Sequence, residues 1–238
     1  MLKNKLSRFG ALTGATMVLG LLASQSASAA VIVTDGAIID SIPGISTFQT
    51  TGADMDGMAV TVNLFGGGSE TVFWADTGVG AGAATGAGWS ISLTGDSFSN
   101  PWQVDFGNLA VTSFVLDGTA VPSSAVFDID NTNNPGTLGS ALGLPFASNL
   151  VGDALITATY SRAIQIGAAV PFGDLFHVLT VNLSGVSGGE AGIGGQFTFV
   201  QDTDSDIRRD VPLPEPGTLG ILGGALIAIG LIRRSRTA

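Results

Sequence analysis

Apolar and polar residues alternate in short runs through the middle of the chain, where a helical period is nearly absent. In residues 59–65, Val60, Val62 and Leu64 alternate with polar neighbours. Alternation with a period of two places apolar side chains on one face of a β-strand. The runs expected to form strands are residues 37–42, 59–65, 71–75, 89–94, 102–106, 111–116, 125–129, 155–161, 175–183 and 196–200.

Gly, Asn, Asp, Ser and Pro separate these runs at close intervals, which is typical of strands joined by short turns. The pattern predicts an all-β ectodomain over residues 31–210, built as an antiparallel two-sheet β-sandwich of jelly-roll-like type. Residues 78–88 are rich in Gly and Ala, and we expect them to form a surface loop. We expect a second loop at residues 131–143, and no internal repeat is visible.

The first 29 residues have the three parts of a secretory signal peptide. Basic residues open the chain, the apolar stretch 9–23 follows, and Ala27 and Ala29 form a small-residue cleavage site. We expect a signal-peptide helix that a signal peptidase removes. An N-terminal membrane anchor is the alternative, but the apolar stretch is short for a membrane span.

Residues 217–232 form a second apolar run close to the C-terminus. As a helix this run would be roughly 24 Å long, against about 30 Å for a hydrocarbon core, so it would span a membrane only with local thinning. Arg233, Arg234 and Arg236 follow it and should stay cytoplasmic. A transmembrane helix at 217–232 would therefore leave the preceding domain outside the inner membrane.

The tripeptide Pro214-Glu215-Pro216, the apolar run and the terminal arginines together resemble the PEP-CTERM sorting signal. In that family an exosortase, an integral membrane transpeptidase, recognises the tail and cuts at or near the motif. The resemblance implies that residues 211–238 are a sorting segment. It also implies a Gram-negative-type bacterium in which the protein passes from the inner membrane to the cell surface or extracellular polysaccharide. A plain single-span anchor behind a proline-stiffened linker is the alternative.

Three local phrases also resemble those common in PEP-CTERM ectodomains. They are residues 51–55, residues 95–98 together with Trp102, and residues 199–204. No defined activity follows from this resemblance.

The charge of the chain is unevenly distributed. All nineteen acidic residues lie between Asp35 and Glu215, whereas six of the nine basic residues lie in the two terminal segments. From Asp35 to Asp210, eighteen acids minus three bases gives −15. Such a surface repels phosphate backbones, which excludes nucleic acid as a partner. The chain has no cysteine, which excludes thiol catalysis and cysteine metal sites.

Two oxygen-rich segments, residues 128–134 and 202–206, suggest a structural calcium ion. Residues 202–206 have the D-x-D-x-D start of a calcium loop, but Ile207 and Leu213 stand where an EF-hand needs Gly and Glu. Polar strand ends with Asx turns are the alternative. The weak calcium-ligand candidates are Asp128, Asp130, Asp202, Asp204 and Asp206. No other cofactor is expected.

One serine motif suggests a hydrolase. Ser187 lies in a literal G-x-S-x-G sequence, but glycines follow it where a nucleophile elbow needs a helix. The single histidine, His177, precedes the serine, the reverse of the order in α/β-hydrolases. We therefore expect no enzyme, and a structural role for His177.

The aromatic residues Trp74, Trp89, Trp102 and Tyr160 suggest a sugar-stacking platform, for which Trp102 is the best candidate for an exposed ring. Core or rim packing is the role that we expect for these aromatic residues. The sequence thus favours a non-enzymatic cell-envelope protein that an exosortase sorts to the cell surface or to a biofilm matrix. A carbohydrate-binding β-sandwich module at the cell surface is the alternative function.

Overall fold

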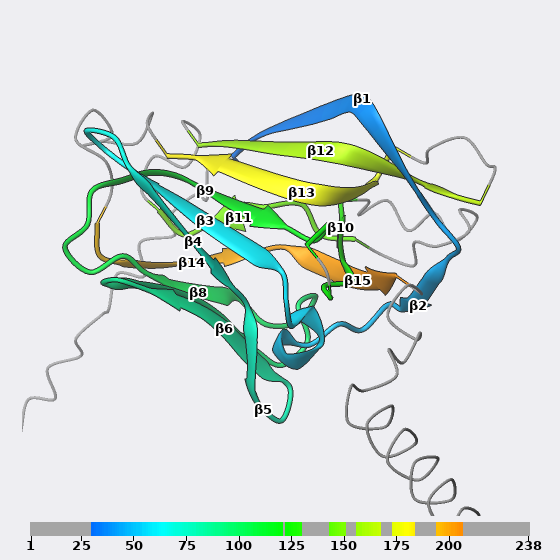
Figure 1. The fold of residues 1–238 in the computed structure, drawn as a ribbon, viewed down its shortest axis with the longest axis horizontal. Coiled ribbons are helices and arrows are strands. Elements are labelled where there is room, and N and C mark those ends of the chain that lie inside the picture. The colour runs from blue at the N-terminus through cyan, green and yellow to red at the C-terminus, as the bar shows by residue number, and fades with distance from the viewer. Residues whose placement is uncertain are drawn as a thin grey trace, which may run out of the picture.

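The computed structural model describes residues 30–120, 122–129, 143–150, 156–167, 173–183 and 194–206. Within these ranges the fold is all-β: two sheets account for the regular structure, apart from one 3-10 turn, η1 (Gly52–Met55) (Figure 1). The expected signal peptide at 1–29 and the expected sorting tail at 211–238, with the two helices expected there, lie outside the described residues.

The larger sheet has the order β2-β15-β10-β13-β9-β3-β4, with β12 also paired to β13 and β1 paired to β12. These pairs are antiparallel except β1–β12, which is parallel and departs from the expected antiparallel pattern. Its strands are β1 (Val31–Ile42), β2 (Ile45–Thr47), β3 (Ala59–Leu64), β4 (Ser69–Phe73), β9 (Val111–Asp117), β10 (Ala125–Asp128), β12 (Thr157–Ile166), β13 (Leu175–Asn182) and β15 (Asp202–Asp206).

The smaller sheet has the order β11-β14-β8-β7-β6-β5 and is antiparallel throughout. In Figure 1 its strands β8, β6 and β5 lie below β12, β13 and β9 of the larger sheet. Its strands are β5 (Ala75–Gly78), β6 (Ala81–Gly86), β7 (Trp89–Thr94), β8 (Trp102–Asp105), β11 (Ala147–Ser148) and β14 (Gln196–Val200).

One hydrophobic core lies between the two sheets. Phe114 of β9 packs against Phe199 of β14, with ring centroids 5.7 Å apart, and Phe199 in turn stacks on Trp102 of β8. Both sheets contribute fully buried side chains to this cluster. Burial of apolar surface at about 25 cal/mol per Å² is the main favourable term that holds such sheets together without disulfides.

A second, smaller hydrophobic cluster lies on the opposite face of the larger sheet. It joins Ile42 of β1, Val126 of β10, Ile164 of β12 and Leu175 of β13. Phe127, which follows Val126 on β10 and points to the other face, belongs to the main core. The sheet is therefore covered on both faces at this end. This second layer matters for the site because β10 and β15 are neighbours in the sheet.

The strand predictions are confirmed where alternation is regular. The runs 89–94 and 196–200 coincide with β7 and β14. The expected loop at 78–88 is wrong, because β6 occupies Ala81–Gly86. Its small residues reflect close packing: a Cβ on Gly82 would collide with the Gly52 carbonyl oxygen and the Trp74 indole. Glycine was therefore a sign of close approach rather than of a loop.

Candidate functional site: a buried polar junction

The three family-like phrases, far apart in the sequence, meet in space around β15. We call residues 50–55, 95–102 and 199–206 the polar junction. The Ser97 hydroxyl donates to Asp202 Oδ1 at 2.9 Å and accepts from the Thr203 N–H at 3.0 Å. The Ser97 N–H donates to the Thr50 carbonyl oxygen at 3.0 Å. One serine on the β7–β8 connection therefore links all three segments.

Two tryptophans strengthen the polar junction from inside the core. Trp102 Nε1 donates to the Gln201 carbonyl oxygen at 2.9 Å, and Trp74 Nε1 donates to the Gly52 carbonyl oxygen at 2.7 Å. Trp102 is 0% exposed, so it packs in the core and is not the exposed ring of a sugar-stacking platform. Its indole is used to bury an aromatic surface and to satisfy a backbone carbonyl at once.

Gln201 connects the polar junction to Tyr160 on β12 of the larger sheet. The Tyr160 hydroxyl donates to Gln201 Oε1 and accepts from the Phe146 N–H at 2.8 Å. Gln201 Nε2 donates to the Asp202 carbonyl oxygen at 2.7 Å. Burial raises the pKa of Tyr160 well above its usual range, which keeps the phenol a hydrogen-bond donor.

Three aspartates of β15 are almost completely buried. Asp202, Asp204 and Asp206 are 1%, 1% and 2% exposed, and β15 is a strand rather than the polar turn that its composition suggested. Alternation places all three carboxylates on one face of the sheet. Asp128 lies directly opposite Asp202 in the β10–β15 register and is also buried. Aspartate is rarely buried in this way unless it is paired.

Burial and like charge raise the pKa values of two of these carboxyls. Burial raises the pKa of Asp204 to about 9, and the charges of Asp202, Asp128 and Asp174 add to the shift. Burial raises the pKa of Asp202 to about 7; Asp128 adds to this shift, while the hydrogen bond from Ser97 opposes it. In metal-free protein at neutral pH, Asp204 is therefore mainly protonated.

The five calcium candidates are not gathered at one point in the described part of the chain. Within those residues, no three or more Asp, Glu or His side chains are placed to hold a metal ion together. Asp206 instead faces His177, with Oδ2 3.7 Å from Nε2. Asp130 lies outside the described residues. Of the candidates, Asp128 and Asp202 are paired across β10 and β15, and Asp204 lies two positions along β15.

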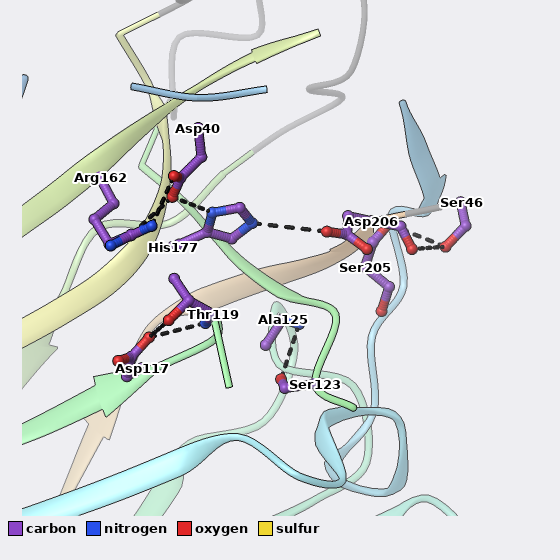
Figure 2. A network of polar contacts seen from close by, with 10 residues as sticks. All are labelled: Asp40, Ser46, Asp117, Thr119, Ser123, Ala125, Arg162, His177, Ser205 and Asp206. Carbon is purple, nitrogen blue, oxygen red and sulfur yellow. Dashed lines mark hydrogen bonds and ion pairs between the residues drawn. The ribbon is translucent and has the colours of Figure 1, made fainter. Parts of the chain in front are cut away.

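A second polar cluster links β1 to β13 and β15 (Figure 2). Arg162 donates from Nε and Nη2 to the two Asp40 oxygens, each at 2.8 Å, and His177 Nδ1 lies 2.8 Å from Asp40 Oδ2. Burial acts to raise the pKa of Asp40, but the hydrogen bonds from Arg162 and His177 outweigh it and lower the pKa. Arg162 itself adopts a left-handed backbone with φ 60°.

His177 is enclosed by this cluster. The ring is 1% exposed, and its two nitrogens face the carboxylates of Asp40 and Asp206. Ser187 lies outside the described residues, so the hydrolase hypothesis concerns a residue that the structure does not place. Sequence reasoning missed the Asp40–Arg162 pair because the two residues are 122 positions apart.

The residues expected to direct export and sorting are also outside the described part: Ala27, Ala29, Pro214, Glu215, Pro216, Arg233, Arg234 and Arg236. Among the residues that are described, no helix has the length and apolar character needed to cross a membrane. Comparisons of the chain with protein-family models, with curated proteins and with solved structures found no match.

Proposed function

We propose that this chain is an exported, non-catalytic protein of the cell envelope. A signal peptidase removes residues 1–29, and an exosortase recognises Pro214-Glu215-Pro216 in the inner membrane. The acidic domain, a jelly-roll-like sandwich of its two sheets, then reaches the cell surface or the extracellular polysaccharide matrix. There it acts as a structural component.

The observation that carries this proposal is the order of features at the C-terminus. A proline-flanked glutamate, a short apolar run and an arginine cluster follow one another over the last residues of the chain. The apolar run is marginal as a permanent span, which suits a segment that is transferred to a processing enzyme. The signal peptide and the arginines independently place the domain on the same, outer side.

The polar junction supports a structural role for the domain. Each of the three family-like phrases contributes polar groups to internal hydrogen bonds, as Ser97 does with Asp202 and Thr203. Their recurrence in such ectodomains is then explained by the fold that they hold together. The alternative sugar-binding module loses its best exposed ring, because Trp102 is buried against Phe199.

The proposal is tested by replacing Pro214, Glu215 and Pro216 with alanine in a host that has an exosortase. Mass and location of the protein are followed in membrane, surface and medium fractions. We expect the variant to accumulate in the inner membrane with its tail attached. Pro212→Ala, which alters the same linker and leaves the tripeptide intact, is the matched control and should be sorted normally. Identical mass and location for the triple variant and the unaltered protein would reduce the tail to a simple anchor.

A further inference from the structure

The carboxylates of Asp202 and Asp204 leave oxygens unsatisfied inside the protein. Within the part of the chain that the structure describes, Oδ2 of each is buried and has no hydrogen-bond partner. The two residues are two positions apart on β15 and so point to the same face, where Asp128 lies opposite Asp202. Leaving buried oxygens of this kind unpaired costs free energy, more so for charged groups.

Positive charge is scarce around this group. Among the described residues Arg162 is the single Lys or Arg, and its guanidinium pairs with Asp40. Asp204 instead experiences the negative fields of Asp202, Asp128 and Asp174. A buried acidic group can be neutralised either by protons or by a bound cation.

The backbone approaches this group closely at one glycine. A Cβ on Gly143 would collide with the Asp128 carboxylate, so the chain there can come near only without a side chain. The Leu144 N–H bonds the Asp128 carbonyl oxygen at 3.2 Å, and the Leu144 carbonyl oxygen accepts from the Asp202 N–H at 3.0 Å. The backbone of residues 143–144 therefore lies directly against Asp128 and Asp202.

We propose that Asp202 and Asp204 bind a calcium ion on the buried face of β15 that carries their carboxylates, with Asp128 contributing to the negative field. Calcium takes six to eight oxygen ligands in flexible geometry, so the two carboxylates supply part of the shell and backbone oxygens or water supply the rest. An EF-hand loop is not needed. The choice of calcium over other cations rests on the export proposed above, since extracellular sites operate at high calcium concentration.

The test is thermal unfolding and calorimetric titration of the full-length chain purified in detergent, which does not depend on where the protein resides in the cell. The comparison includes unaltered protein, Asp204→Asn, and Asp76→Asn as a matched control on the exposed strand β5. Each is measured in chelator, in calcium and in magnesium. We expect calcium to raise Tm of the unaltered protein and of Asp76→Asn by at least about 4 °C, with one ion bound per chain.

The Asp204→Asn variant makes the result decisive. In chelator its Tm should equal or exceed that of the unaltered protein, because an amide removes a buried carboxyl without changing its shape. In calcium the order should reverse, since only the carboxylate gains from the ion. No calcium response in the unaltered protein, an equal response in Asp204→Asn, or an equal response to magnesium would each overturn the proposal. Such a failure would leave the sorting proposal untouched.

Discussion

The Ser97 hydroxyl donates to Asp202 Oδ1 at 2.9 Å and joins segments 105 residues apart in the sequence. Ser97 Oγ also accepts a hydrogen bond from the Thr203 N–H, so one small side chain satisfies two buried groups. Ser97 follows β7 of the smaller sheet, and its partners Asp202 and Thr203 lie on β15 of the larger sheet. The contact therefore fixes how the two sheets meet at this end of the domain.

Replacing Ser97 with alanine should lower the free energy of unfolding by about 1–3 kcal/mol, because Asp202 Oδ1 and the Thr203 N–H lose this buried partner. Urea unfolding followed by circular dichroism measures the change. Ser99→Ala is the matched control: its hydroxyl makes an exposed 3.3 Å bond to Asp96, so its loss should cost less than about 0.5 kcal/mol. Equal effects of the two substitutions would show that the buried contacts of Ser97 do not stabilise the fold.

The left-handed backbone of Arg162 leads to a second prediction. Arg162→Ala and Arg162→Gly both remove the ion pair with Asp40, but only glycine adopts φ 60° without steric cost. Arg162→Gly should therefore be more stable than Arg162→Ala by about 1 kcal/mol. Chemical denaturation of the two variants measures the difference. If alanine proved equal or better, the left-handed conformation would not be present in solution.

The buried carboxyls predict how stability depends on pH. The pKa values of Asp202 and Asp204 are raised to about 7 and about 9 in the folded chain, against an ordinary value of 3.8. Above pH 3.8 the folded chain holds more protons on these two carboxyls than the unfolded chain does. The free energy of unfolding therefore falls as pH rises, until the folded pKa values are passed. The lowered pKa of Asp40 acts oppositely, and its contribution is lost only as pH falls below 3.8.

In chelator, the free energy of unfolding should therefore fall between about pH 7 and pH 9 by on the order of 1–2 kcal/mol. Asp204→Asn should reduce this slope, since its amide does not titrate. Urea titrations at both pH values provide the measurement. A slope that is the same in the variant would mean that Asp204 is already ionised in the folded protein at neutral pH.

Burial of the tryptophans predicts the outcome of sugar-binding assays. Trp74, Trp89 and Trp102 all belong to the main core, so acrylamide should quench their fluorescence weakly until the protein unfolds. Polysaccharides and a glycan array should give no signal that depends on these rings. Trp102→Phe should lower stability through loss of the bond to Gln201, without affecting any ligand. A glycan hit that Trp102→Phe abolishes would restore the carbohydrate-binding alternative.

The sequence predicted those strands whose apolar positions alternate regularly, as in β7, where Trp89, Ile91 and Leu93 are buried. It failed where side chains are small or charged. β6 was missed because its glycines are set by contact with Gly52 and Trp74, which are distant in sequence. β15 was missed because buried aspartates contradict the usual hydrophobic pattern of a strand.

The polar junction could be predicted only in part. The three phrases were visible as segments that resemble those of PEP-CTERM ectodomains, yet their meeting depends on pairing between strands far apart in the chain, such as β10 with β15. The resemblance also could not distinguish Trp102 as an exposed ring from Trp102 as a core residue. Its hydrogen bond to the Gln201 carbonyl oxygen is a tertiary contact without a local signal.

The measurement that tests the central claim most directly is the intact mass of the protein recovered from the surface of exosortase-positive cells. The account predicts a chain that begins at Ala30 or Val31 and ends at or near Pro214-Glu215-Pro216, without the apolar run 217–232 or the three terminal arginines. Recovery of surface protein whose last peptide still ends at Ala238 would contradict the account.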